Sequence, residues 1–226
     1  MAKTRGKQAQ FVIIDEAAMS AVERDRLDSK RQRVTRAARL ARAQLLAASS
    51  KVTNRSPERA RWFCLHVHAG REFAVEAVLN DADVENCMPR ETDIVVKRGQ
   101  KIEVQRPFLP GYVLVRFVPS PAAFSGLLRR KGVFDFVRSS DGYRTVSDRE
   151  VSIFKGIAAG DPSDLPVDKT IKQGDRAKIT MGPFGGFDCV VLAVKHTRKP
   201  YARLLVDMFG TKTEISRLHL AFLKKL

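Results

Sequence analysis

His66 and His68 are the residues whose types and spacing come closest to metal-binding chemistry. They alternate along a predicted strand and could be read as a pair of ligands. No acidic residue or third histidine stands at a useful spacing, so a structural or solvated role is favoured. Cys64, Cys87 and Cys189 are scattered, without the paired spacing of a zinc site. We therefore expect no metal and no cofactor.

The glycine-rich stretch 182–186 is the other candidate for chemistry. It reads Gly-Pro-Phe-Gly-Gly and lacks the Lys-Ser/Thr pair of a phosphate-binding P-loop. It also opens no predicted helix, so it is interpreted as a turn. Polar residues that converge on a pocket are not evident elsewhere in the sequence. The chain is therefore not expected to be an enzyme.

The net charge of the chain indicates which class of molecule it binds. Its 226 residues carry a formal net charge of +16, with 44% hydrophobic residues, enough for a real core. Residues 1–61 hold 15 Lys and Arg against 6 Asp and Glu, a net charge of +9. Such a balance indicates nucleic acid or a nucleoprotein machine. No apolar run reaches the length of a membrane span and no signal peptide is evident, so a cytoplasmic protein without a membrane partner is expected.

Residues 106–118, with the sequence RPFLPGYVLVRFV, organise the middle of the chain. Two prolines and a glycine hold Phe108 and Leu109 in a stiff loop, and residues 112–118 then read as a strand that is apolar on both faces. Two interpretations of Phe108, Leu109 and Tyr112 stay open. They are ordinary core, or they form an open apolar patch for a partner helix.

The surrounding periodicity predicts an α+β sandwich at 61–159, with helices on a mainly antiparallel sheet. Trp62 is expected on one face of the first strand, and Phe134 and Phe136 together on one face of a later strand. The predicted strands are 62–67, 92–96, 102–104, 112–118 and 133–137, and the predicted helices are 72–80, one from 120, and 147–158. Residues 160–169 read as a linker. Five short strands after residue 170 predict a small β-barrel.

The basic N-terminal arm, residues 1–60, leaves several interpretations open. Residues 17–48 are good helix formers with a thin apolar stripe, namely Val34, Ala38, Ala41, Leu45 and Ala48. The arm is a solvated or partly disordered segment, a segment that lies on nucleic acid, or a helix that folds on a partner. Candidate nucleic-acid contacts are Arg31, Arg33, Arg36, Arg39 and Arg42 in the arm, with Lys97, Arg98 and Lys101 at a predicted hairpin tip.

Several stretches together resemble NusG-type transcription elongation and antitermination factors. They are RWFCLHVHAGRE, RPFLPGYVLVRF, GVFDFV, TVSDREV, QGDRAKITMGPFGGFDCVV and LLVDMFGTKTEI, in the order that the family shows. The resemblance covers about residues 61–226. It implies an RRM-like NusG N-terminal domain at 61–159 and a KOW-type β-barrel at 170–226.

The resemblance also implies partners and site residues. The first domain of the family binds the clamp helices of RNA polymerase, suppressing pausing or termination, through a pocket whose matching positions here are Trp62, Phe108, Leu109, Pro110 and Tyr112. The family's barrel recruits the termination factor Rho or a small-subunit ribosomal protein, and its matching positions are Pro183, Phe184, Met208, Phe209 and Gly210. A monomer is expected.

This sequence departs from the family pattern at three points. Cys189 stands where the family's barrel has a glycine, so the turn expected there must tolerate a side chain. The arm of about 60 residues is an addition, and the barrel carries clustered basic residues. The sequence is therefore as compatible with a specialised RfaH-like factor, or a phage or plasmid version, as with the housekeeping factor. The alternative function is a KOW-containing RNA-binding protein of the ribosome or of ribosome assembly.

Overall fold

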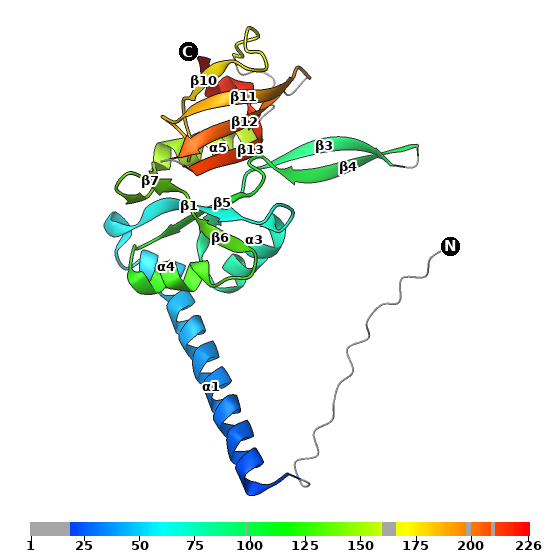
Figure 1. Cartoon of the computed structure of the whole chain (residues 1–226). Coiled ribbons are helices and arrows are strands. Elements are labelled where there is room, and N and C mark those ends of the chain that lie inside the picture. The colour runs from blue at the N-terminus through cyan, green and yellow to red at the C-terminus, as the bar shows by residue number, and fades with distance from the viewer. Residues whose placement is uncertain (1–18, 98, 160–165, 198–199, 209–210) are drawn as a thin grey trace. The chain divides into compact units, whose positions relative to one another are not determined.

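The structure is a computed structural model that describes residues 19–97, 99–159, 166–197, 200–208 and 211–226. Its helices are α1 (Ala21–Leu46), α2 (Ser50–Thr53), α3 (Glu72–Asp81), α4 (Pro121–Leu128) and α5 (Asp148–Ala159). Its strands are β1 (Arg61–Val67), β2 (Glu85–Cys87), β3 (Arg90–Lys97), β4 (Gln100–Pro107), β5 (Tyr112–Phe117), β6 (Val133–Phe136), β7 (Arg138–Ser139), β8 (Gly142–Tyr143), β9 (Thr145–Val146), β10 (Arg176–Ile179), β11 (Asp188–Lys195), β12 (Tyr201–Met208), β13 (Thr211–His219) and β14 (Leu223–Lys225). Helices and antiparallel strands confirm the predicted α+β class (Figure 1).

The chain divides into two compact units, Met1–Leu40 and Ala41–Leu226. In the first unit, α1 begins after Ser20, whose hydroxyl accepts a hydrogen bond from the Glu23 amide at 3.3 Å. The Glu23 carboxylate accepts one from the Ser20 amide at 2.9 Å, which completes a capping box. This cap places the helix start four residues later than the composition predicted. The second unit contains two larger sheets, one from each predicted domain.

The first sheet has β1 at its centre. Its strand order is β2-β5-β1-β6, with β9 also paired to β1, and every described pairing in it is antiparallel. In the β1–β5 register Trp62 lies opposite Arg116 and His66 lies opposite Tyr112. Strand β2 was missed in the sequence because three residues, Glu85–Cys87, give no readable alternation.

The two faces of β1 are covered by different elements. Phe63, Leu65 and Val67 belong to a buried cluster with side chains of α3 and α4, whereas Trp62 and Cys64 belong to a second cluster on the opposite face. This alternation follows from the period of two along a strand. The second cluster continues without a break into the core of the C-terminal sheet. Both faces of the central strand are therefore buried.

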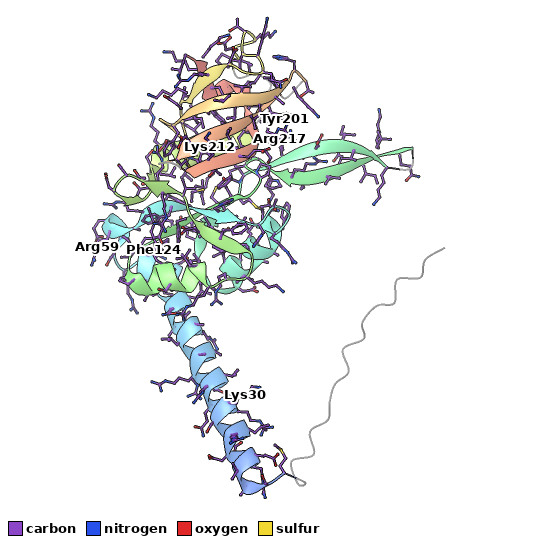
Figure 2. The ribbon with its side chains drawn as sticks, in the orientation of Figure 1. Lys30, Arg59, Phe124, Tyr201, Lys212 and Arg217 are labelled. Carbon is purple, nitrogen blue, oxygen red and sulfur yellow. The ribbon has the colours of Figure 1, made fainter. Side chains whose placement is uncertain are left out.

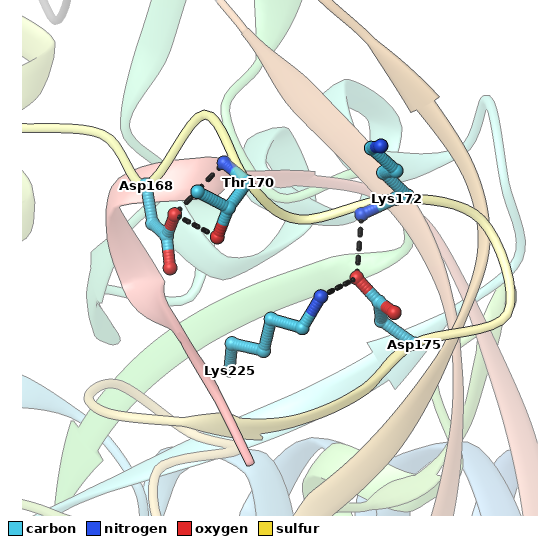
Figure 3. Close-up of polar contacts among 5 residues, drawn as sticks. All are labelled: Asp168, Thr170, Lys172, Asp175 and Lys225. Carbon is cyan, nitrogen blue, oxygen red and sulfur yellow. Dashed lines mark hydrogen bonds and ion pairs between the residues drawn. The ribbon is translucent and has the colours of Figure 1, made fainter.

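The C-terminal sheet confirms the five predicted strands, in the order β13-β12-β11-β10-β14. Asp175, just before β10, accepts hydrogen bonds from the Lys172 amide at 2.8 Å and from Lys225 Nζ at 2.7 Å (Figure 3). Asp168 similarly accepts bonds from the amide and hydroxyl of Thr170. The Lys225 bond, followed by that of Lys172, holds the pKa of Asp175 below its usual value. The bond from Lys225 joins β14, the last strand of this sheet along the chain, to the residue before β10, the first.

Two local expectations need correction. Cys189 is not in a turn: it lies in β11, is 3% exposed, and its pKa is raised by burial to about 11. Phe134 and Phe136 do not share a face, because the β1–β6 register shifts beside Val67. Phe136 is buried near Phe63, whereas Phe134 is exposed and lies against His66 and His68.

Strands β3 and β4 form a separate two-stranded ribbon that projects from the sheets (Figure 1). Both strands are longer than predicted, and β4 extends through Pro107, a residue expected to lie in a loop. The apolar side chains along it are largely exposed, namely Ile94, Val96, Ile102 and Val104. Burial of apolar surface therefore contributes little to the stability of this ribbon. Its pairing depends on the backbone hydrogen bonds and on cross-strand contacts, such as the hydrogen bond from Gln105 Nε2 to Thr92 Oγ1 at 2.8 Å.

The end of α1 and the helix α2 pack against the first sheet domain. Leu45 and Ala48 are buried in the cluster below β1, and the Ser50 amide donates to the Asp83 carbonyl at 2.6 Å. Gly126 in α4 permits this approach, because a Cβ there would lie 2.5 Å from the backbone of Gln44 and Leu45. Helix–helix packing this close requires glycine.

Gly126→Ala should therefore destabilise the Ala41–Leu226 unit by about 1–3 kcal/mol, the usual effect of overpacking a tight contact. Gly156→Ala is the matched control, because no atom lies within 4 Å of a Cβ at that helical position. That control should be neutral or stabilising by about 0.5–1 kcal/mol. Chemical denaturation measures both, and equal stability of the two variants would contradict the packing argument.

Candidate functional site

The predicted polymerase-binding residues lie on one face of the first sheet, at a loop held from several sides. The Phe108 amide donates to the Pro89 carbonyl at 2.8 Å, and the Val67 amide donates to the Gly111 carbonyl at 2.8 Å. The buried carboxylate of Glu72 accepts from the Gly111 amide at 2.8 Å. Gly111 has a φ of +86°, which favours glycine at this turn. The loop is therefore pre-formed.

Trp62 is fixed on this face by α5. Its indole Nε1 donates to Asp148 Oδ1 at 2.9 Å, and Lys155 Nζ lies 5.4 Å from the ring centroid. A buried indole N–H needs such an acceptor. The side chain is 4% exposed, so α5 orients Trp62 and also covers it.

Phe108 and Tyr112 are covered by residues 166–226, which hold the C-terminal sheet and which we call the C-terminal domain. The ring of Phe184 meets Tyr112 edge to face at a centroid distance of 4.7 Å, and Phe222 meets Phe108 at 5.9 Å. Edge-to-face pairs of this kind stabilise a contact by about 0.5–1.5 kcal/mol beyond the stabilisation that burial of their apolar area gives. Phe108, Leu109 and Tyr112 are each 4% exposed. We call the set Trp62, Phe108, Leu109 and Tyr112 the covered face.

The expectation of an open apolar patch is therefore wrong for this arrangement of the chain. The covered face is apolar and pre-formed as predicted, but the protein's own α5 and C-terminal domain occupy it. Pro110, at its edge, remains half-buried and lines a cavity together with Tyr201 and Arg217. The sequence could not reveal which surface covers this face, because the hydrophobic effect is non-directional and any apolar partner of suitable shape can bury it.

The covered face contains one unsatisfied polar group. The hydroxyl of Tyr112 is buried and has no hydrogen-bond partner among the described protein groups. Burial, followed by the nearby Cys64, raises the pKa of Tyr112 well above its usual value. Leaving such a group unpaired costs about 1–3 kcal/mol. The contact with Phe184 is therefore less favourable for tyrosine than it would be for phenylalanine.

Polar contacts border this interface. Arg217 of β13 pairs with Glu91 of β3 at 2.7 Å, with little exposure of either side chain. Arg217 also lies over the ring of Tyr201, 4.4 Å from its centroid, and both are labelled in Figure 2. Glu150 of α5 accepts a hydrogen bond from the Gly182 amide at 3.1 Å. Together these contacts fix how the C-terminal domain lies on the first.

Glu150 has two roles, of which the sequence revealed one. The predicted capping box is present, because Glu150 accepts bonds from the amide and hydroxyl of Ser147. Burial raises the pKa of Glu150, but these bonds, the bond from Gly182 and the charge of Arg144 hold it below its ordinary value. Gly182 has a φ of +85°, and a side chain there would overlap the ring of Phe154. The glycine-rich turn thus serves close packing on α5.

The predicted partner site of the C-terminal domain is turned toward the same interface. Pro183 and Phe184 are buried, and half-buried Met208 packs against the shared cluster. Phe209 and Gly210 lie outside the described residues. Because Phe184 contacts Tyr112, one contact covers a residue of each predicted binding surface.

The predicted nucleic-acid residues are spread over separate elements. Those in α1, which are Arg31, Arg33, Arg36, Arg39 and Arg42, are all exposed. Lys97 and Lys101 are exposed and pair across the end of the β3–β4 ribbon with Gln100 and Val96, respectively. Arg98 lies outside the described residues.

His66 and His68 lie around the exposed ring of Phe134, and His66 also stacks on Tyr112 at 5.0 Å. Burial is the main cause of a lowered pKa at His66, with Asp135 opposing it and His68 adding to it. No group of three His, Cys, Asp or Glu side chains in the described part of the chain could hold a metal ion. Within the same residues, no helix is long and apolar enough to cross a membrane.

Arg217→Gln should loosen the C-terminal domain from the covered face, because it leaves the poorly exposed Glu91 without this ionic partner. The expected weakening is about 1–3 kcal/mol, between the value of an exposed ion pair and the cost of breaking a buried one. Small-angle scattering should show a larger radius of gyration. The charge swap Glu91→Arg with Arg217→Glu is the control and should recover much of the compactness. A compact single variant would mean that the ion pair contributes nothing.

Comparison with known proteins agrees with the motifs. Residues 60–155 match the family described as "Transcription termination factor nusG". The transcription termination/antitermination protein NusG of Pseudomonas aeruginosa is 28% identical over 167 residues, which cover 69% of this chain and 93% of that protein. NusG of Escherichia coli (strain K12) is 28% identical over 166 residues, covering 69% and 91%.

One solved structure, described as "Domain interaction in Thermotoga maritima NusG", matches with 24% identity and a TM-score of 0.38, covering 75% of this chain and 98% of that one. The family match lies on the first sheet domain, and the two relatives extend well beyond it. The chain is therefore similar to NusG proteins over about two thirds of its length, and residues 60–155 carry the match to the family's domain.

Proposed function

We propose that this chain is a transcription termination/antitermination factor, as its NusG relatives are named, which binds the clamp helices of RNA polymerase through the covered face and Pro110. Binding there suppresses pausing or termination. It requires the C-terminal domain to move away first, because Phe184 and Phe222 now occupy Tyr112 and Phe108. The protein acts as a cytoplasmic monomer and not as an enzyme.

The contact between Tyr112 and Phe184 is the observation that carries this proposal. The apolar groove that suits a foreign helix is already formed, and a segment of the same chain fills it reversibly. The unpaired Tyr112 hydroxyl supports a second state, because a phenylalanine would serve the closed contact better. In the open state the hydroxyl is free to reach water or a partner.

In the open state the C-terminal domain exposes Pro183, Phe184 and Met208, which we propose contact Rho or a small-subunit ribosomal protein, together with Phe209 and Gly210. One closed contact then restrains both binding events. By thermodynamic linkage, a partner on either domain raises the affinity of the other domain for its own partner. Polymerase binding and barrel recruitment are thus coupled.

A ribosomal or ribosome-assembly role is the competing function. Contacts to ribosomal RNA go mostly to phosphate, so they favour Lys and Arg over large apolar side chains. The covered face consists of Trp62, Phe108, Leu109 and Tyr112, which favours a protein helix as its ligand. Affinity purification of the native protein separates the two functions, because polymerase accompanies it in the first and ribosomal particles in the second.

A binding titration with a polymerase clamp-helix fragment tests the site. Arg217→Gln should tighten apparent binding by about 10-fold or more, because the apparent Kd falls as the competent fraction rises. Tyr112→Ala and Leu109→Asp should lose binding although both also disturb the closed contact. Tyr112→Phe should weaken binding by favouring the closed state.

Thermal denaturation of each variant controls for loss of the fold. A purely structural role of the covered face predicts that Tyr112→Ala binds at least as well as the wild type, since it opens the interface. That result, in a variant that remains folded, would remove the clamp-helix assignment. A fragment that binds the wild type and Arg217→Gln equally would remove only the requirement for opening.

A further inference from the structure

The basic part of α1 is not used by the contacts described so far. Residues 29–46 contain six Lys or Arg and no Asp or Glu. Every residue from 28 to 40 is exposed, including Val34 at 63% and Leu40 at 52%. Lys30 is labelled on this helix in Figure 2. Its surface is therefore free to meet another molecule.

Five of these six basic residues follow a period of three, and Arg31 is the exception. Lys30, Arg33, Arg36, Arg39 and Arg42 are each three positions apart. Each step advances about 4.5 Å along an α-helix and turns by about 60° backwards around it. The five cations therefore spiral through about 240° over about 18 Å of the axis. They do not form one charged side.

This distribution argues against two kinds of partner. A flat anionic surface, such as a membrane, would meet cations on one side only and favours an amphipathic helix. A protein groove would need an apolar stripe, but Leu45 and Ala48 of the predicted stripe are already buried in this chain. What remains, Val34 and Ala38, offers little area.

We propose that the basic part of α1 lies in the major groove of duplex DNA and binds the phosphates on both rims of the groove. That groove is about 12 Å wide and admits an α-helix, so anionic groups flank the helix on opposite sides. The corresponding groove of A-form RNA is too deep and narrow for side chains to read. Phosphate contacts fix position without reading sequence, so the binding is non-specific.

This inference goes beyond the proposed function, because it concerns a different surface and ligand. Its assay contains no polymerase, so its failure leaves the clamp-helix proposal unaffected. The probe is a labelled DNA duplex of about 20 base pairs, and fluorescence anisotropy of the full chain is followed as salt is raised. With five phosphate contacts the logarithm of the binding constant should fall against log salt with a slope of about −4.5.

The test variant is the triple substitution Arg33→Gln, Arg36→Gln and Arg39→Gln. Glutamine is a good helix former, so circular dichroism should show the helix retained. The slope should become shallower by about 2.7, which is about 0.9 for each lost contact. The control is Lys169→Gln, Lys172→Gln and Lys178→Gln, which removes the same charge from exposed positions of the C-terminal domain and should change the slope little.

The single variants Lys30→Gln, Arg36→Gln and Arg42→Gln, which lie about 120° apart around the helix, test the geometry. Each should make the slope shallower by about 0.9, because contacts on all sides count equally. An effect at only one of them, or equal effects of the two triple variants, would overturn the groove proposal. Tighter binding to duplex RNA, to single-stranded RNA or to anionic vesicles than to duplex DNA would overturn it as well.

Discussion

A central strand that is apolar on both faces must be covered on both faces, and the structure of the Ala41–Leu226 unit depends on this constraint. Strand β1 places Phe63 and Leu65 against helices and Trp62 and Cys64 on the other side. Two layers would leave that second side in water, which costs about 25 cal/mol for each Å² of apolar surface. Helix α5 and the C-terminal domain supply the missing layer.

The same constraint explains how the proposed binding surface can be buried without being lost. A face that suits an apolar partner helix also suits apolar side chains of its own chain, because the hydrophobic effect is non-directional. The internal partner has the advantage of being tethered, which raises its effective concentration. It has the disadvantage of the unpaired Tyr112 hydroxyl. Because these contributions oppose each other, we expect the closed state to be only modestly more stable than the open state.

Local periodicity predicted the central strands, the helices of the first domain and the five strands after residue 170, since period and turn residues are local properties. It could not predict that Phe184 meets Tyr112, or that Arg217 pairs with Glu91, because these pairs join distant segments through a contact without a sequence signature. Cys189 was misplaced because the family pattern suggested a turn where an ordinary strand pairing exists. The displaced ring of Phe134 shows how one register shift reverses a face assignment.

The two ends of helix α1 have sequence patterns with different physical causes. Toward its end, the pattern is set by packing: Leu45 and, just beyond the helix, Ala48 are buried, and Gly126 of α4 is small enough to let the backbone approach. Earlier, cations recur every three residues with exposed side chains between them. A surface helix that packs on protein repeats its apolar residues at three and four positions alternately, to keep them on one side. A strict period of three drifts around the helix and serves no packing surface. That stretch is therefore better explained by an external ligand that surrounds the helix than by the fold to which its end is attached.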